Sequence, residues 1–417
     1  MKFHLNLLRA VNEAIYQVFE ENKYADKVLE KVLRSNNLWG ARDRAFIAEN
    51  TYDMVRYWRL IRTVAELETH ELNEQNLFTL FGTWQVLKGV HLPNWEEFKN
   101  VDPKQIDHNY KQMKTQRKIA HSLPDWLDEL GYNELGKQWN KEVEALNETA
   151  PVVIRVNTLK TNKAELIKKL QEREIYTAVV PGCKDALVLK ERQNLFITPE
   201  FKEGLFEVQD ASSQLVADYL MIEPGMRIVD ACAGAGGKSM HIAALSQNKG
   251  RIISLDTEQW KLDEAKKRAR RAGVSNLELR VIEAKTIKKL YGTADRLLLD
   301  VPCSGIGVLK RNPDAKWKLS LGFIDRVRAQ QKEILNDYSK ILKPGGIMVY
   351  ATCSILPSEN SQQVHAFLKD HSNYELMEEK NLFPSETGFD GFYMARIKRK
   401  EEAKKVDKEM NVIKEQA

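Results

Sequence analysis

The chain has 417 residues, of which 43% are hydrophobic and 29% charged, a composition that predicts two or three folded domains and excludes a mostly disordered protein. No apolar run is long enough to cross a membrane and the first residues lack a signal-peptide pattern, so we expect a cytoplasmic protein. The four cysteines are widely separated, which excludes a disulfide framework and predicts no metal site, and the net charge of +5 permits a nucleic-acid partner without demonstrating one.

Residues 1–145 predict an all-helical domain. Apolar residues recur three or four apart in segments such as LLRAVNEAIYQVF, ADKVLEKVLR and NLFTLFGTWQVL. Three arginines, Arg56, Arg59 and Arg62, repeat every three residues in the same region. They form either a strip that contacts phosphates or an ordinary solvated face.

Residues 146–205 predict a small α+β subdomain that links two larger parts. Short β-branched runs, VVIRVN, YTAVV and ALVLK, flank the helix-like NKAELIKKLQER. From residue 206 to residue 398 strands and helices alternate, which predicts an α/β domain with a doubly wound, mostly parallel sheet. Ligands of such sheets bind at the carboxyl ends of the strands. The charged residues 399–417 predict a solvated or disordered tail.

The sequence DACAGAGGKS follows the first strand of this sheet and leads into a helix. A phosphate-binding P-loop requires a glycine where Cys232 stands, and a dinucleotide-binding loop requires a third small residue where Ser239 stands, so both interpretations are weak. The third interpretation is the loop of a methyltransferase, with Asp230 ending the strand and Asp256 ending the next strand. Asp256 is placed to accept hydrogen bonds from a ribose, although an acidic residue there also serves as a helix N-cap.

Two cysteines lie just beyond the ends of two consecutive strands, in LLLDVPCSG and VYATCSILPSEN. Asp300, Cys303 and Cys353 should therefore meet at the carboxyl edge of the sheet. This set suits methylation of cytosine C5, because C5 becomes nucleophilic only after a thiolate adds at C6 and is later eliminated. Asp300 would stabilise the adduct near N3 of the base. The residues alone do not decide which cysteine attacks.

A basic stretch follows the first of these cysteines. Lys310, Arg311, Lys316 and Lys318 surround Trp317, against the single acid Asp314. Cations beside an aromatic side chain predict a path for single-stranded RNA whose target base is turned out of its stack.

The motifs DACAGAGGKS, LLLDVPCSGIGVLKRNPDAKW, VYATCSILPSEN and DGFYMARI resemble those of the Nop2/Sun (RsmB-type) RNA cytosine-C5 methyltransferases. The resemblance covers roughly residues 150–398 and implies a Rossmann-like class I domain that uses S-adenosylmethionine. It further implies that Cys353 is the nucleophile, that Cys303 assists product release, and that ribosomal RNA of the small subunit is the partner. The cofactor residues that it implies are Cys232, Ala233, Gly234, Ala235, Gly236, Gly237, Lys238, Asp256, Asp300 and, in place of the family's adenine-binding aspartate, Glu283.

The helical part is faintly similar to the NusB-like RNA-binding domain of bacterial members of this family. Two alternatives to an enzyme of ribosomal RNA stay open: a tRNA cytosine-C5 methyltransferase, and a catalytically silent RNA-binding factor of ribosome assembly. The two cysteines and the intact glycine loop disfavour the silent factor.

Overall fold

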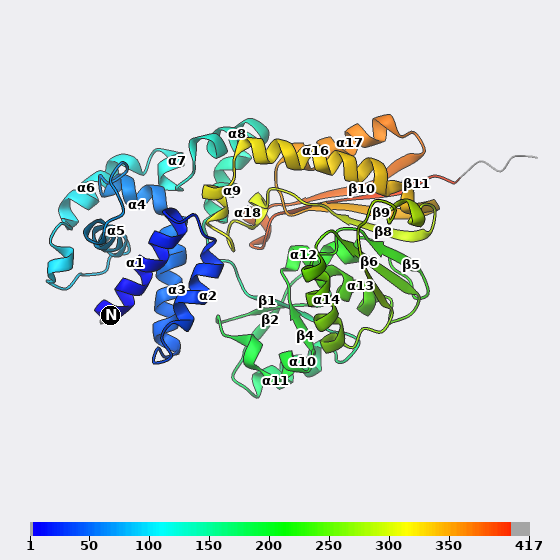
Figure 1. The fold of residues 1–417 in the computed structure, drawn as a ribbon, viewed down its shortest axis with the longest axis horizontal. Helices are drawn as coiled ribbons and strands as arrows, with labels where there is room; N and C mark the ends of the chain where they lie inside the picture. The colour runs from blue at the N-terminus through cyan, green and yellow to red at the C-terminus, as the bar shows by residue number, and fades with distance from the viewer. Residues whose placement is uncertain (1–2, 402–417) are drawn as a thin grey trace, which may run out of the picture.

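The computed structural model describes residues 3–401 of the chain. Figure 1 shows three parts in chain order, a group of helices, a small sheet and a large sheet covered by helices. The tail expected at residues 399–417 lies outside the described residues from residue 402 onward. No helix among residues 3–401 is both long and apolar enough to span a membrane.

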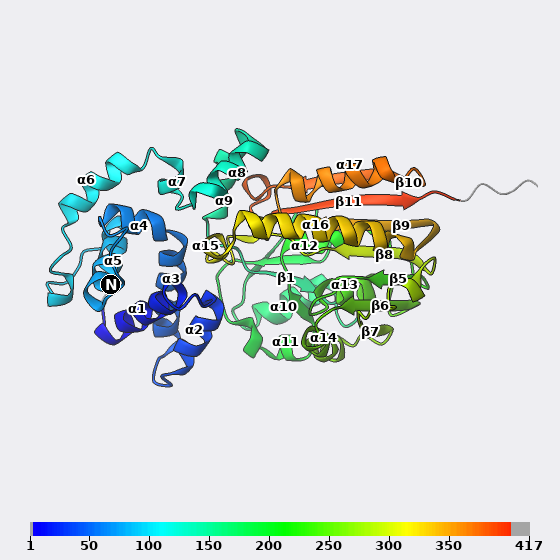
Figure 2. The ribbon, with the colours of Figure 1, turned by 45° about the horizontal axis from the view of Figure 1, so that its top comes forward.

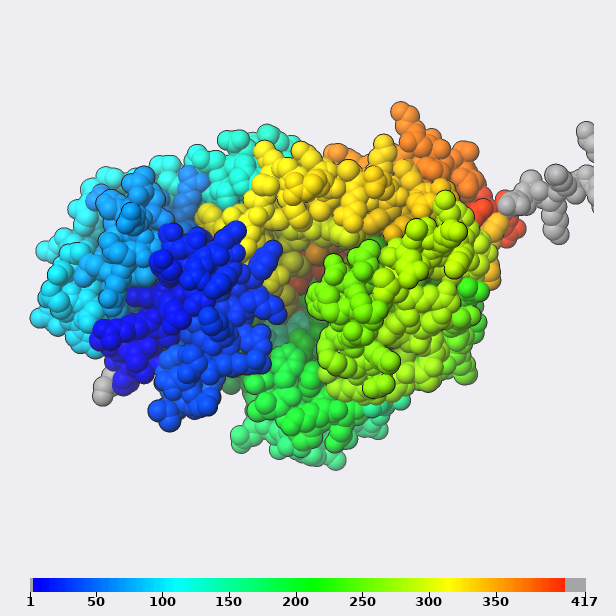
Figure 3. Space-filling view, in the orientation of Figure 1, coloured from blue at the N-terminus to red at the C-terminus, as the bar shows by residue number. Residues whose placement is uncertain are grey.

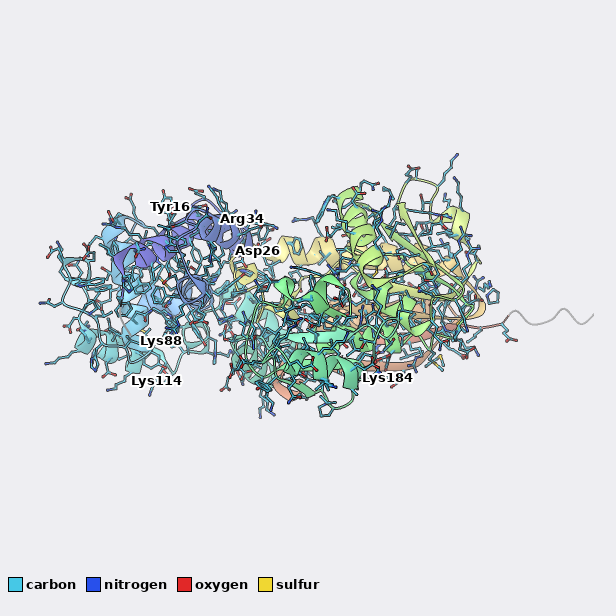
Figure 4. The ribbon with its side chains drawn as sticks, turned by 90° about the horizontal axis from the view of Figure 1, so that it is seen from below. Tyr16, Asp26, Arg34, Lys88, Lys114 and Lys184 are labelled. Atoms are coloured by element: carbon cyan, nitrogen blue, oxygen red, sulfur yellow. The ribbon has the colours of Figure 1, made fainter. Side chains whose placement is uncertain are left out.

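The first part packs its helices around a core rich in aromatic side chains. Asn73 starts the fifth helix by accepting a hydrogen bond from the Asn76 amide, and Asp102 with Pro103 starts the sixth, as N-cap residues do. The helices are α1 (Leu5–Phe19), α2 (Ala25–Arg34), α3 (Ala41–Arg56), α4 (Trp58–Val64), α5 (Glu74–Leu87), η1 (Glu96–Phe98), α6 (Pro103–Met113) and α7 (Arg117–Ala120). In Figure 4, Tyr16 and Arg34 lie on the opposite side of this part from Lys88 and Lys114.

Two further helices, α8 (Asp125–Leu135) and α9 (Gln138–Leu146), pack against the large-sheet part. Trp139 of α9 is completely buried and donates its ring N–H to Asp128. A side chain at Gly131 would place its Cβ 2.3 Å from the Trp139 ring, so only glycine allows this contact. Helical periodicity predicts these helices, but it does not say which part they pack against.

The small sheet is antiparallel, with the strand order β2-β3-β1-β4. Its elements are β1 (Val153–Val156), α10 (Lys163–Gln171), β2 (Thr177–Val179), β3 (Ala186–Leu189), η2 (Leu195–Ile197), α11 (Pro199–Lys202) and β4 (Phe206–Val208). Because β4 pairs with β1, this sheet extends to Val208, slightly beyond the expected limit at residue 205.

The large sheet has the strand order β10-β11-β9-β8-β5-β6-β7. The five strands from β9 to β7 in this order are parallel and β11 is antiparallel to β9, which confirms the predicted α/β fold class. The strands are β5 (Arg227–Asp230), β6 (Arg251–Asp256), β7 (Leu277–Val281), β8 (Ala294–Asp300), β9 (Leu342–Thr352), β10 (Tyr374–Leu382) and β11 (Phe392–Arg399). The sequence analysis did not predict β10 and β11 as a pair of strands.

Helices cover both faces of this sheet (Figure 2). Ile228 packs on the side of α12 and α13, whereas its neighbour Val229 packs on the side of α16 and α17, as alternating side chains of a strand must. The helices and short turns are α12 (Ala211–Asp218), α13 (Gly237–Leu245), α14 (Gln259–Ala272), η3 (Lys288–Leu290), η4 (Ile306–Val308), α15 (Ala315–Lys318), α16 (Leu321–Tyr338), η5 (Ser339–Ile341), η6 (Pro357–Glu359), α17 (Ser361–Asp370) and α18 (Pro384–Thr387).

The carboxyl ends of the parallel strands point toward the helical part, because β11 runs antiparallel to β9 and points away from it (Figure 2). Figure 3 shows a hollow on this face of the molecule, between the blue helical part, the yellow segment after β8 and the green half of the chain. The strand ends of the large sheet therefore open toward a recess that all three parts border.

Candidate active site

The two cysteines meet beyond the ends of adjacent parallel strands. Asp300 ends β8 opposite Ala351 of β9, so the segments after these strands start side by side. Cys303 and Cys353 are half-buried, and their sulfur atoms lie 3.2 Å apart, within hydrogen-bond distance. The structure thus places together two thiols that are fifty residues apart in the sequence.

The surroundings of Cys303 disfavour its thiolate form. The hydrogen bond to Cys353, burial and nearby negative charge raise the pKa of the Cys303 thiol well above its ordinary value. Either sulfur can be the donor in the hydrogen bond between the two cysteines. The assignment of the nucleophile to Cys353 stays a prediction.

Lys238 and Asp300 form an ion pair beside the thiols, with 2.6 Å between Nζ and Oδ2. Burial alone would lower the pKa of Lys238, but the charge of Asp300 and its hydrogen bond raise it, as does negative charge on Cys353. The ammonium group also lies 5.3 Å from the centre of the Phe392 ring. A permanent positive charge is therefore held next to the sulfur that would attack.

The glycine loop between β5 and α13 needs its glycines for two different reasons. Gly236 has φ +79°, and a Cβ there would come within 2.9 Å of Ala265. Gly234 has φ +54°, and no atom lies within 4 Å of the position that its Cβ would take. Gly236 thus lets the loop pack against α14, and Gly234 leaves open space beside the loop.

Two arginines hold this loop, and the sequence analysis did not identify them. Arg155 of β1 donates to the Gly237 carbonyl oxygen at 2.8 Å, and Arg268 of α14 donates to the Ala235 carbonyl oxygen at 3.0 Å. Arg155 is buried, and burial lowers its pKa to about 10. Nothing in the local sequence marks Arg155, because its partner lies 82 residues away at the start of α13.

Asp256 stands where the methyltransferase interpretation of the loop requires it. One carboxylate oxygen accepts the Gly234 amide and the other accepts the Glu258 amide, both at 2.9 Å. Asp256 therefore ties the loop to the start of α14, and each oxygen keeps a lone pair for a ligand. The N-cap residue of α14 is Glu258, so the interpretation of Asp256 as a helix N-cap is wrong, and its role toward a ribose stays a prediction.

Of the two carboxylate oxygens of Asp230, one has a hydrogen-bond partner among residues 3–401 and the other has none. Ser239 donates its hydroxyl to Oδ2 at 2.6 Å, whereas Oδ1 is buried and has no hydrogen-bond partner among residues 3–401. Burial raises the pKa of Asp230 to about 7. Burial also raises the pKa of Cys232 well above its ordinary value, so this thiol is neutral.

Glu283 follows Ile282, whose backbone N–H donates to the Asp256 carbonyl oxygen at 2.9 Å. The Glu283 side chain is exposed, its backbone N–H donates to the Thr286 hydroxyl at 2.9 Å, and its carbonyl oxygen accepts the Thr286 amide at 2.9 Å. Ala284 and Lys285 beside it are exposed as well. A role for Glu283 in binding the cofactor stays a prediction.

The predicted RNA path around Trp317 is wrong, because Lys310, Asp314 and Lys316 are buried and the partly exposed Arg311, Trp317 and Lys318 are also hydrogen-bonded within the protein. Lys316 is 1% exposed and donates to the carbonyl oxygens of Arg56 and His121, and burial lowers its pKa well below the ordinary value. Trp317 donates its ring N–H to the Val55 carbonyl at 2.8 Å. The carboxylate of Asp314 accepts the first amide of α2.

Lys310 and Arg311 are also engaged within the protein. Lys310 is 2% exposed and bonds the Gly388 carbonyl. Arg311 bridges two buried carboxylates, Asp390 at 2.6 Å and Asp210 at 2.8 Å. A charged sequence pattern cannot distinguish an RNA surface from a polar contact between domains, because both use the same residue types.

The other candidate strip for phosphate contacts, Arg56, Arg59 and Arg62, also makes hydrogen bonds within the protein. Arg56 is buried and donates to the Lys310 carbonyl oxygen. Arg59 donates to the Leu123 carbonyl oxygen, and Arg62 to that of Leu67. These side chains support the packing of the helices and their contact with the large-sheet part.

No group of three or more His, Cys, Asp or Glu residues within 3–401 is arranged to hold a metal ion.

Two family models match the chain: the 16S rRNA methyltransferase RsmB/F model over residues 217–398, and the ferredoxin-like domain of the RsmF/B-like methyltransferases over residues 123–195. The ribosomal RNA small subunit methyltransferase B of Klebsiella pneumoniae strain 342 is 30% identical, with 95% of this chain and 99% of the relative covered. A probable ribosomal RNA small subunit methyltransferase B of Synechocystis is 30% identical, with 85% and 86% covered. A crystal structure of a methyltransferase homologue from Pyrococcus horikoshii is 29% identical, has a TM-score of 0.61, and covers 68% of this chain and 97% of its own.

Proposed function

The chain belongs to the RsmB/F family of 16S ribosomal RNA methyltransferases, and from this premise we propose that it methylates C5 of a cytosine in small-subunit ribosomal RNA. It is an S-adenosylmethionine-dependent enzyme and its partner is ribosomal RNA. The base, the atom and the residue roles are the proposed part. We also propose that it works in the cytoplasm, where bacterial relatives would meet their ribosomal RNA.

The observation that carries the proposal is the thiol pair beside an ion pair at the carboxyl edge of the sheet. Transfer to an exocyclic amine needs no thiol, whereas transfer to cytosine C5 requires a nucleophile at C6 and a base that later removes the C5 proton. Two adjacent thiols can provide both groups.

The residues around the glycine loop fit S-adenosylmethionine, which when bound supplies an electrophilic methyl group. The unpaired Oδ1 of Asp230 suits an ammonium group, and the space beside Gly234 suits the amino-acid portion. The free lone pairs of Asp256 suit the ribose hydroxyls. We propose the following cofactor residues: Cys232, Ala233, Gly234, Ala235, Gly236, Gly237, Lys238, Asp256, Glu283 and Asp300.

In the proposed reaction the Cys353 thiolate forms a bond to C6 and the C5–C6 double bond supplies electrons to C5. C5 would take the methyl group as the bond between that methyl group and the sulfur of S-adenosylmethionine breaks, with S-adenosylhomocysteine as the leaving group. The positive charge of Lys238, fixed by Asp300, stabilises the negative charge that moves onto the ring. Once Cys353 is a thioether, Cys303 releases its proton to water.

The second half of the reaction restores the resting pair. The Cys303 thiolate takes the C5 proton, the C5–C6 double bond re-forms, and the bond from C6 to Cys353 breaks. Cys303 is again protonated and Cys353 is again a thiolate, while one proton has left for solvent. This balances the net release of one proton when a methyl cation replaces a ring hydrogen.

We also keep the division into a helical part (residues 1–145), a linking subdomain (146–205), a catalytic domain (206–398) and a tail as a proposal. The function is tested by incubating the protein with unmodified 16S ribosomal RNA and methyl-labelled S-adenosylmethionine, followed by nucleoside mass spectrometry. Label in 5-methylcytidine is the expected result. Label in another nucleoside, or none in 5-methylcytidine, contradicts the proposal.

A further inference from the structure

One buried carboxylate connects the two loops that carry the thiols. Glu359, at the end of η6, is completely buried. It accepts hydrogen bonds from the Ser304 amide at 2.8 Å and the Ser304 hydroxyl, and from the Ser354 hydroxyl at 2.6 Å. Ser304 directly follows Cys303, and Ser354 directly follows Cys353.

The Glu359 side chain is held from other directions as well. Gln331 of α16 donates to its second oxygen at 3.1 Å and also to the Pro302 carbonyl oxygen, one residue before Cys303. The Tyr350 hydroxyl donates to the Glu359 backbone carbonyl at 2.7 Å. Removal of this side chain would leave buried donors unpaired on both cysteine loops, which is costly in a low-dielectric interior.

No cation pairs with this carboxylate among its hydrogen-bond partners in residues 3–401. Its donors are one amide of the backbone, two hydroxyls and one side-chain amide. Buried polar atoms that lose their hydrogen-bond partners are costly, so these four donors hold the side chain in one position.

We propose that Glu359 is a positioning residue of the thiol pair: its carboxylate, bonded to Ser304 and Ser354, holds the Cys303 and Cys353 loops so that the two thiols lie at hydrogen-bond distance. This rests on the proposed function for its catalytic meaning, but not for its geometry. The group does not touch the substrate in this scheme and acts through Ser304 and Ser354.

Most of the groups that face Cys303 raise the pKa of its thiol. Cys353 and Glu359 both raise the pKa of Cys303, and only the Gly305 amide lowers it. Tyr350 of β9 is buried nearby, and the proximity of Cys303 and Glu359 contributes to raising the pKa of its phenol, so it is neutral. Lys238 faces the other thiol, Cys353.

The first test requires no RNA. The rate at which diamide joins Cys303 to Cys353, followed by peptide mass spectrometry, reports the separation of the thiols, and iodoacetamide labelling between pH 6 and 10 reports the titration of each. Glu359→Ala should slow disulfide formation about tenfold or more, since the loops lose their common anchor. Glu359→Gln keeps the size and most hydrogen bonds, so it should form the disulfide near the wild-type rate.

The chain offers a matched control. Glu142 of α9 is also completely buried and accepts the Ser385 amide, the Ser385 hydroxyl and the Gln138 side-chain amide. It connects α9 to α18 and contacts neither cysteine loop. Glu142→Ala and Glu142→Gln should lower the melting temperature but change neither the disulfide rate nor the labelling profile of Cys303.

The inference is overturned if folded Glu359→Ala forms the disulfide at the wild-type rate. If Glu359→Ala does not fold, Ser304→Ala with Ser354→Ala removes the same hydroxyl links while Glu359 remains, and a wild-type disulfide rate in that double variant likewise overturns it.

Measurements of methyl transfer then distinguish a failure of the proposed function from a failure of the Glu359 inference. With the Glu359 variants, kcat should fall about tenfold or more for Ala and less for Gln, with the KM for S-adenosylmethionine unchanged, because the cofactor residues are not involved. Normal thiol chemistry in a wild-type protein that makes no 5-methylcytidine contradicts the proposed function alone. Disturbed thiols only in the Glu142 variants contradict the Glu359 inference alone.

Discussion

The role of the basic stretch in the contact between domains can be tested by measuring the stability of a variant at Arg311. Its guanidinium lies between Asp210 and Asp390, both buried, and also donates to the Pro151 carbonyl oxygen. Arg311→Met keeps much of the volume but leaves two carboxylates facing each other without a cation. Loss of one partner from a buried ion pair costs about 3–5 kcal/mol, so the variant should melt well below the wild type at pH 8.

The pH dependence of this loss has a definite sign. Burial and the charge of Asp210 raise the pKa of Asp390 to about 6 even with Arg311 present. A carboxyl whose pKa is raised by folding favours the folded state at low pH, and this contribution is lost as the pH rises through the folded-state pKa. The deficit of Arg311→Met should therefore be largest above pH 7 and shrink toward pH 5.

Thermal melts of Arg311→Met at pH 5, 6, 7 and 8 measure this directly, with the exposed Arg270 of α14 mutated to Met as control. The interface account is refuted if Arg311→Met melts like the wild type at pH 8 while its ribosomal RNA affinity falls and the salt dependence of binding flattens, because that is the behaviour of a phosphate contact.

Two further predictions concern the cofactor loop. Asp256→Asn should weaken S-adenosylmethionine binding by about 2 kcal/mol, the scale of charge-assisted hydrogen bonds. Calorimetry measures this change, with Asp263→Asn as the control. An unchanged affinity of Asp256→Asn would remove Asp256 from the cofactor site. Folding raises the pKa of Asp230 from 3.8 to about 7, so its charge destabilises the cofactor-free protein as the pH rises through 7. Asp230→Asn should therefore stabilise the cofactor-free protein at pH 8 by up to about 4 kcal/mol, while its binding of S-adenosylmethionine becomes weaker. Denaturation curves of the wild type and the variant that coincide at pH 5 and at pH 8 would contradict this.

The sequence predicted those parts of the molecule that depend on local pattern. Strand and helix periodicity located β5 to β9 with their helices, and the rule that parallel strands end at one edge brought Cys303 and Cys353 together. The chemical demand of cytosine C5 then explained why two thiols are needed.

The rest depends on long-range partners that no local pattern identifies. Lys316 and Trp317 look like an RNA surface until α3 is seen to accept their hydrogen bonds. Arg155 is one residue of an apolar strand, and only the folded chain shows that it holds the Gly237 carbonyl. Glu359 was noticed only as part of a motif, although the serine after each cysteine was a signal for a shared partner.

The central claim is that Cys353 attacks and Cys303 releases. Denaturing gels of each variant with labelled 16S ribosomal RNA and S-adenosylmethionine test it most directly, since only a covalent adduct migrates with the protein. Cys353→Ala should form no adduct and no 5-methylcytidine, whereas Cys303→Ala should accumulate methylated RNA attached through Cys353 because the C5 proton is not removed. Adduct that accumulates in Cys353→Ala and is absent from Cys303→Ala would contradict the account and reverse the two roles.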